Sequence, residues 1–82
     1  MIKDLVEYLA KSLTEHPDQV LVSQREEEDA IIIELKVLSE DMGKVIGKQG
    51  RIAKSIRTLV KAAAGQDERK KIAVDIIPRD EE

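Results

Sequence analysis

The sequence predicts a small α+β domain in which three helices pack on one face of an open three-stranded sheet. Apolar residues recur at helical spacing in three segments, and they alternate at strand spacing in three others. The order of these segments along the chain is α-β-β-α-α-β. Three strands are too few to close a barrel, so the helices must cover the apolar face of the sheet.

The first half of the chain is expected to form a helix followed by a β-hairpin. One helical face carries Ile2, Leu5, Val6, Leu9 and Leu13. This helix should end near His16, because Pro17 disfavours the helical conformation of the residue before it. A short strand follows at 20–23, and the acidic run 26–29 is expected to be a solvated turn. Residues 30–38 are the partner strand, with Ile31, Ile33, Leu35 and Val37 on one side and Ile32, Glu34, Lys36 and Leu38 on the other.

The second half is expected to form two helices and a last strand. Ser39 should cap a short helix, which Gly47 interrupts. A longer helix follows Gly50 and stops at Gly65. Its buried face is expected to carry Ile52, Ile56, Leu59, Val60 and Ala63.

The last strand completes a single domain. Residues 72–77 alternate again, and Pro78 closes the strand. We therefore expect one domain over residues 1–79 and a short acidic tail over 80–82. A chain of 82 residues with Tyr8 as its one aromatic residue has a small core, which an oligomer would help to stabilise.

The composition argues against an enzyme. The chain has no cysteine and one histidine, His16, so it offers no convincing nucleophile, base or metal cluster. We expect no catalytic residue, no metal ligand and no cofactor. The longest apolar run has about four residues, far short of a membrane span, and the first residues lack a signal-peptide core. A cytoplasmic protein is expected.

The charge of the chain is unevenly distributed. Between positions 42 and 66 there is no Asp or Glu, and six cations occur: Lys44, Lys48, Arg51, Lys54, Arg57 and Lys61. The remaining residues hold 8 of the 14 basic and all 17 acidic side chains, a net charge of −9. A chain with a net charge of −3 therefore contains a segment of +6, here called the basic segment, and such a segment attracts an anionic polymer.

Two glycines, Gly47 and Gly50, lie in the middle of the basic segment. Glycine tolerates the backbone angles of a tight link between two helices and lets a sugar-phosphate chain approach the main chain. Backbone N–H groups at the start of the second helix favour phosphate oxygens. Lys48 and Arg51 add charge, and Gln49 adds a neutral donor. A plain helix–helix turn is the alternative, and the neighbouring cations favour the nucleic-acid site.

The motif Val45-Ile46-Gly47-Lys48-Gln49-Gly50, preceded by two strands, resembles that of KH domains, and the α-β-β-α-α-β order is similar to their type II arrangement. Residues 40–64 and a length near 80 resemble the small stand-alone bacterial KH proteins of the KhpA type, and the resemblance covers nearly the whole chain. There is one departure. KH helices commonly read G-x-x-G-x-x-Ile-x-x-Ile, whereas here the third residue after Gly50 is Ala53.

The resemblance implies that the G-x-x-G loop clamps the backbone of about four nucleotides of single-stranded RNA. On that basis, the expected RNA contacts are Lys44, Val45, Ile46, Gly47, Lys48, Gln49, Gly50, Arg51, Ile52, Lys54 and Arg57. An apolar floor for the bases would come from Val45, Ile46, Ile52 and Ile33. The resemblance also implies a role as an RNA chaperone or post-transcriptional regulator.

The resemblance further implies protein partners, namely a second copy of the chain or a larger KH-containing protein of the Jag type. The alternative hypothesis is that the domain serves mainly as a dimerisation module for such a partner. The apolar candidates for this surface are Leu21, Ile32, Leu38 and Ile77, each of which could equally be an ordinary surface residue.

Overall fold

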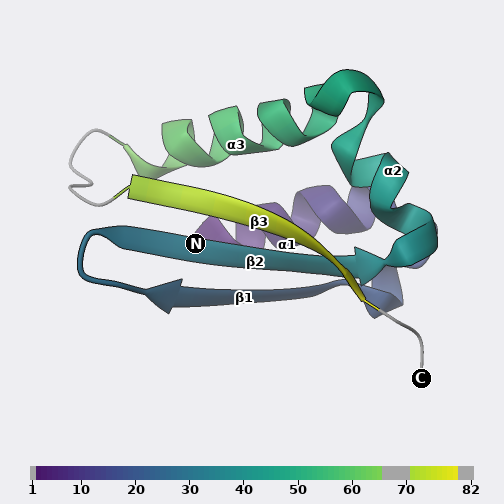
Figure 1. The fold of residues 1–82 in the computed structure, drawn as a ribbon, viewed down its shortest axis with the longest axis horizontal. Coiled ribbons are helices and arrows are strands. Elements are labelled where there is room, and N and C mark those ends of the chain that lie inside the picture. The colour runs from purple at the N-terminus through teal and green to yellow at the C-terminus, as the bar shows by residue number, and fades with distance from the viewer. Residues whose placement is uncertain (1, 66–70, 80–82) are drawn as a thin grey trace.

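The computed structural model describes residues 2–65 and 71–79, so the predicted acidic tail lies outside the described residues. The main elements are α1 (Ile2–Leu13), β1 (Leu21–Glu26), β2 (Ala30–Leu38), α2 (Met42–Ile46), α3 (Arg51–Ala64) and β3 (Lys71–Arg79) (Figure 1). Short 3-10 turns lie at Pro17–Gln19, Ser39–Asp41 and Lys48–Gly50. The predicted α-β-β-α-α-β order and α+β class are confirmed.

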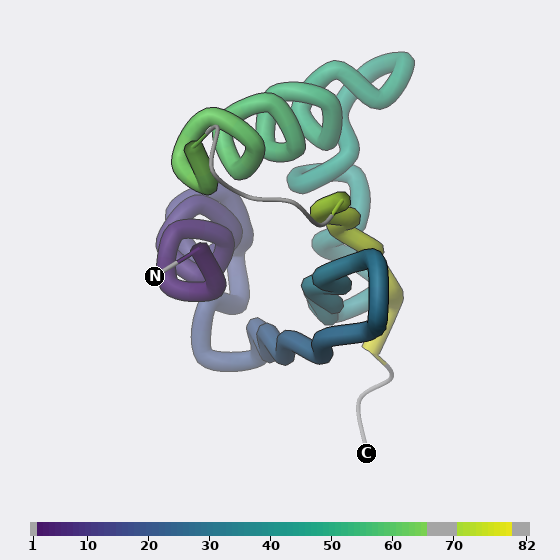
Figure 2. Tube along the Cα trace, turned by 90° about the vertical axis from the view of Figure 1, so that its left-hand side faces the viewer, coloured from purple at the N-terminus to yellow at the C-terminus, as the bar shows by residue number. Residues whose placement is uncertain are grey.

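The sheet has the order β1-β2-β3, with β2 in the centre. Strand β1 pairs with β2 in antiparallel fashion through the short turn predicted at the acidic run, whereas β3 is parallel to β2. A parallel neighbour needs a long crossover, and α2 and α3 provide it. Seen along the strands, α1 and α3 form one layer and the sheet forms the other (Figure 2).

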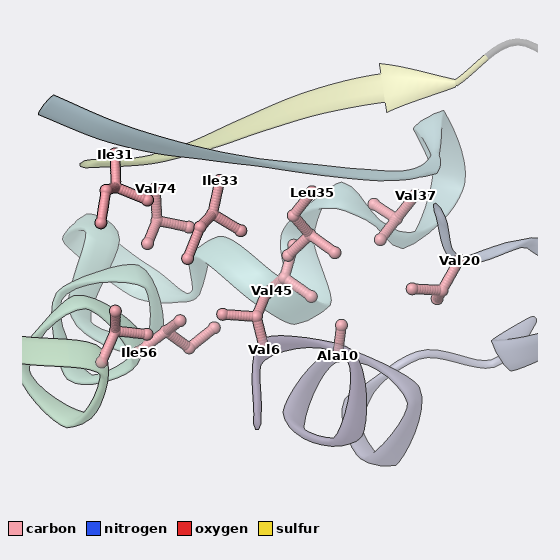
Figure 3. Packing of buried hydrophobic residues seen from close by; sticks show 11 residues of the cluster. Val6, Ala10, Val20, Ile31, Ile33, Leu35, Val37, Val45, Ile56 and Val74 are labelled. Atoms are coloured by element: carbon pink, nitrogen blue, oxygen red, sulfur yellow. The ribbon is translucent and has the colours of Figure 1, made fainter. Parts of the chain in front are cut away.

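The core lies between these two layers. The four residues predicted to share one side of β2 all point into it: Ile31, Ile33, Leu35 and Val37 are buried. They meet Val6 and Ala10 of α1, Val45 of α2, Ile56 and Val60 of α3, and Val74 of β3 (Figure 3). Because small aliphatic side chains fill this layer, the helices can approach the sheet closely without an aromatic residue.

The helix α1 ends at Leu13, three residues before the predicted end. The reason is a long-range contact: the backbone N–H groups of Glu15 and His16 donate to the carboxylate of Asp41 at 3.3 and 3.1 Å. These N–H groups would otherwise bond to carbonyl oxygens one turn earlier in a continued helix. The last predicted turn of the helix is therefore absent, and its two N–H groups bond instead to Asp41, just before α2.

Three other predictions about individual side chains were wrong. Ser39 does not cap a helix, because a 3-10 turn comes first and neither it nor α2 has a side-chain cap bond. Leu59 is 48 % exposed, and the buried face of α3 is instead Ala53, Ile56 and Val60. Leu38 is 4 % exposed, so it offers no surface to a partner. The predicted helix stop is confirmed, since α3 ends at Ala64 and Gly65 has a φ of 81°.

Candidate nucleic-acid interface

The loop between α2 and α3 depends on Gly47. Its φ and ψ of 76° and 176° fall in a region that only glycine occupies readily. A Cβ atom at this position would lie 2.6 Å from Cγ1 of Ile52 and 2.9 Å from its Cδ1. The N–H of Gly47 ends α2 by donating to the carbonyl of Gly43 at 3.0 Å. Backbone conformation and lack of space thus both require glycine here.

The next residues turn the chain outward. Gln49 and Gly50 have consecutive left-handed conformations, with φ values of 56° and 75°. Such a conformation costs a residue other than glycine about 1–2 kcal/mol. Lys48 and Gln49 are exposed at the tip of this turn, and with Arg51 they line a shallow pocket. The loop therefore presents two cations, Lys48 and Arg51, and the neutral amide of Gln49 to solvent at the start of α3.

The helix α3 begins at Arg51 without a side-chain cap. The first N–H groups of a helix have no partner within it, and the helix dipole gives this end a partial positive charge. In this chain that end also contains Arg51 and Lys54, and no acidic residue lies in the first turn. An anion held by the loop would meet both charge and backbone donors.

The cations of the basic segment differ in what they contact. The exposed side chains of Lys48, Lys54 and Lys61 make no ion pair or hydrogen bond with the described residues. Lys44 pairs with Glu15 at 3.1 Å, and Arg57 donates to the carbonyl of Val74. Only part of the predicted charge is therefore free to meet a ligand.

A family model described as "KhpA/KhpB, KH domain" matches residues 3–76. The chain belongs to this KH-domain family. It is 62 % identical over 76 residues to the RNA-binding protein KhpA of Clostridium perfringens, a match that covers 93 % of this chain and all of that protein. The protein of the same name from Clostridium acetobutylicum is 60 % identical over the same shares of the two chains. The predicted resemblance to a small bacterial KhpA-type KH protein is confirmed.

The KH fold also recurs in a larger protein. A crystal structure of Era in complex with MgGDPNP and nucleotides of 16S ribosomal RNA matches with a TM-score of 0.60 and 24 % identity. The match covers 94 % of this chain and 30 % of Era. At this identity the likeness concerns the fold alone.

The family is a non-enzymatic one, which confirms the prediction that the chain is not an enzyme. Within the described residues, no group of three or more His, Asp or Glu side chains is arranged to hold a metal ion. No helix in this part of the chain is long and apolar enough to cross a membrane.

The apolar floor predicted for this KH domain is smaller than expected. Val45 and Ile33 have no exposed surface, so neither can touch a base in this structure. Both belong to the core, because α2 packs directly on β2. Ile46 and Ile52 are partly exposed at the edge of that core. These two residues are the apolar surface available next to the loop.

A polar cluster that the sequence analysis did not predict joins the segment after α1 to the start of α2. We call it the brace, and it consists of Glu15, His16, Glu40, Asp41 and Lys44. Asp41 is 1 % exposed, and its carboxylate accepts the two N–H bonds described above as well as one from the His16 ring, with Nδ1 at 3.2 Å. His16 Nε2 lies 3.4 Å from Glu40, and Lys44 of α2 pairs with Glu15. Partners 25 to 29 residues apart leave no periodic signal in the sequence.

The brace shifts the pKa of both titratable partners. The hydrogen bond to Asp41 raises the pKa of His16 above its usual 6.5, and Glu40 adds to this. Burial alone would raise the pKa of Asp41, but the N–H donors and the His16 ring outweigh it and lower the pKa below 3.8. Both groups therefore stabilise the fold in their charged forms.

We predict a stability that declines as the pH rises. The contribution of protonated His16 is fully present below about pH 6.5, and it is lost as the pH rises through the raised pKa of the folded state. The difference in Tm between wild type and His16→Gln should therefore shrink between pH 6 and pH 9. Thermal unfolding followed by circular dichroism at several pH values measures it. A difference that stays constant would show that His16 does not act through its charge.

Proposed function

We propose that this KH domain binds single-stranded RNA through its G-x-x-G loop, without catalysing a reaction. The observation that carries the proposal is the composition of the loop. Lys48, Gln49 and Arg51 line one shallow pocket there, and the first turn of α3 beside it contains no acidic residue. The curated relatives are named RNA-binding proteins, which supports RNA as the anion. RNA is found in the cytoplasm, where we place this activity.

Phosphate contacts fall first to the loop and the first turn of α3. The proposed clamp is Gly47, Lys48, Gln49 and Gly50, with Arg51 and Lys54 supplying charge. Lys44 joins them only when its ion pair with Glu15 opens. That cost is small, because both side chains are largely exposed.

Base contacts should be weak. The chain has no Phe or Trp, so the stacking platforms of other RNA-binding modules are not available. Bases would instead pack on the exposed parts of Ile46 and Ile52. Weak contacts that depend little on sequence suit an RNA chaperone or a post-transcriptional regulator that acts on many RNAs.

The affinity for RNA is expected to depend on salt in a defined way. Four clamped nucleotides allow about 3–4 neutralised phosphates, and a single strand contributes a slope of about −0.7 for each. A plot of log K against log salt concentration should therefore have a slope of about −2 to −3. Fluorescence anisotropy with a labelled oligonucleotide at several salt concentrations measures it. An affinity that does not change with salt would argue against a nucleic-acid ligand.

A second proposed function is dimerisation, either with another copy or with a larger KH protein of the Jag type. The observation that favours it is the exposure of large apolar side chains, among them Leu21 at 50 % and Leu59 at 48 %. Pairing would cover such residues and join two RNA grooves, which raises the effective concentration for the second contact.

We expect a dimer at micromolar concentration and tighter binding to RNA that is long enough to reach both grooves. Analytical ultracentrifugation and a series of RNA lengths test these two expectations. A monomer at high concentration with no gain from longer RNA would remove self-pairing and leave only the larger partner.

A further inference from the structure

Lys44 is a cation of the basic segment whose side chain already contacts an anion in this structure. Its Nζ lies 3.1 Å from Oε2 of Glu15, and both side chains remain partly exposed to solvent. Glu15 belongs to the segment after α1, 29 residues earlier in the chain. Lys44 lies in α2, about one helical turn before Gly47, where the loop begins. The contact therefore brings a carboxylate to the edge of the proposed phosphate site.

The backbone of Glu15 is held independently of this ion pair. Its N–H donates to the carboxylate of Asp41 at 3.3 Å, and the N–H of His16 donates to the same carboxylate at 3.1 Å. Asp41 is almost completely buried, so these bonds are part of the packed fold. Pro17 restricts the chain directly after them. A side chain on an ordered backbone loses less entropy when it pairs, so the fold favours this pair over an ordinary exposed one.

We propose that Glu15 masks Lys44 in the free protein, and that an RNA phosphate takes its place when RNA binds. This inference rests on the RNA-binding function proposed above. A carboxylate and a phosphate both offer anionic oxygens to the lysine ammonium, so they compete for the same charge. An isolated anion would only exchange one ion pair for another. The next phosphate of a strand already held by the loop is at a high effective concentration, so a strand can displace Glu15.

The mask lowers what Lys44 contributes to RNA affinity. Before Lys44 can meet a phosphate, its pair with Glu15 must open. Exposed ion pairs typically shift an equilibrium constant by between about 1.4-fold and about 5-fold. Lys44 should thus add little to the affinity of the wild type, and removal of the Glu15 carboxylate should restore its contribution.

A double-mutant cycle between Glu15 and Lys44 tests the mask. Glu15→Gln removes the charge but keeps the backbone N–H that bonds to Asp41, so the variant should fold as the wild type does. It should raise the affinity for labelled oligo(U) about threefold when Lys44 is present, and much less in the Lys44→Gln background. Fluorescence anisotropy at one salt concentration gives the four affinities. Equal effects of Glu15→Gln in both backgrounds would overturn the proposal, because they would show that its charge acts only at long range.

The ion pair between Glu7 and Lys11 on α1 is a matched control. Its Nζ and Oε2 atoms are 2.8 Å apart, both side chains are partly exposed, and it lies outside the basic segment. The effects of Glu7→Gln and Lys11→Gln on RNA affinity should be small and additive. A coupling as large as that between Glu15 and Lys44 would overturn the assignment of the mask to the loop.

An NMR titration of the wild type does not depend on any variant. The side-chain carboxyl ¹³C resonance of Glu15 should shift when oligo(U) saturates the protein, and that of Glu7 should not. An unchanged Glu15 resonance with RNA bound would overturn the mask and leave the proposed function intact. Lack of RNA binding by the wild type would overturn the proposed function, and this inference with it.

Discussion

The double replacement Lys48→Asp with Gln49→Asp is expected to weaken RNA binding by about 100-fold or more. The change removes one cation and adds two anions where phosphates are proposed to lie, and each unit of charge at contact distance in water is worth about 1 kcal/mol. Both side chains are exposed at the loop tip, so the thermal unfolding curve should change little. Fluorescence anisotropy with a labelled oligonucleotide gives the affinity, and circular dichroism gives the stability.

A matched control separates loop chemistry from net charge. The pair Lys3→Asp with Gln24→Asp changes the same residue types by the same charge at exposed positions on α1 and β1. It should lower RNA affinity only slightly, through long-range repulsion that salt screens. If the two double variants lost affinity equally, the effect would belong to overall charge and the loop would have no special role.

Gly47→Ala is expected to destabilise the domain by about 2–5 kcal/mol. The new methyl group would overlap Ile52, which packs against the core, and the backbone angles of position 47 are strained for alanine. Because a small domain has only a modest stability to lose, part of the protein should be unfolded at room temperature. Urea unfolding measures the change.

Two other glycines in the same segment are internal controls for Gly47. Gly50→Ala should cost about 1–2 kcal/mol, because its φ is 75° but no atom lies within 4 Å of the new methyl group. Gly43→Ala should stabilise α2 by about 0.5–1 kcal/mol, since Gly43 is a helical position with open space. The expected order is thus Gly43→Ala, wild type, Gly50→Ala and Gly47→Ala, from most to least stable. A Gly47→Ala variant as stable as Gly50→Ala would show that Ile52 moves aside at little cost.

Local patterns in the sequence determined the element order, the two-layer architecture and the position of the loop. Alternation in β2 correctly grouped Ile31, Ile33, Leu35 and Val37 on one side of the strand, because side chains alternate between the two faces of a strand. The G-x-x-G spacing inside a segment without acidic residues predicted where the helices break and where an anion can approach. Alternation, helical spacing and the G-x-x-G motif each involve residues close together in the chain, so they can be recognised from the sequence alone.

Only the tertiary structure decided which side chains are free to act. In the sequence, Asp41 is a charged residue near a helix start and Arg57 a charged residue on a helix face, and both would be expected in solvent. In the structure Asp41 is buried and bonded to His16, and Arg57 donates to the carbonyl of Val74. Val45 belongs to the loop motif but lies wholly inside the core. Each of these outcomes depends on a partner that is distant in sequence and is brought close when α1 and β3 pack against the α2–α3 unit. The periodicity of a sequence does not predict such long-range contacts. It indicates which face of a helix or strand a residue occupies, but not which residues pack against that face.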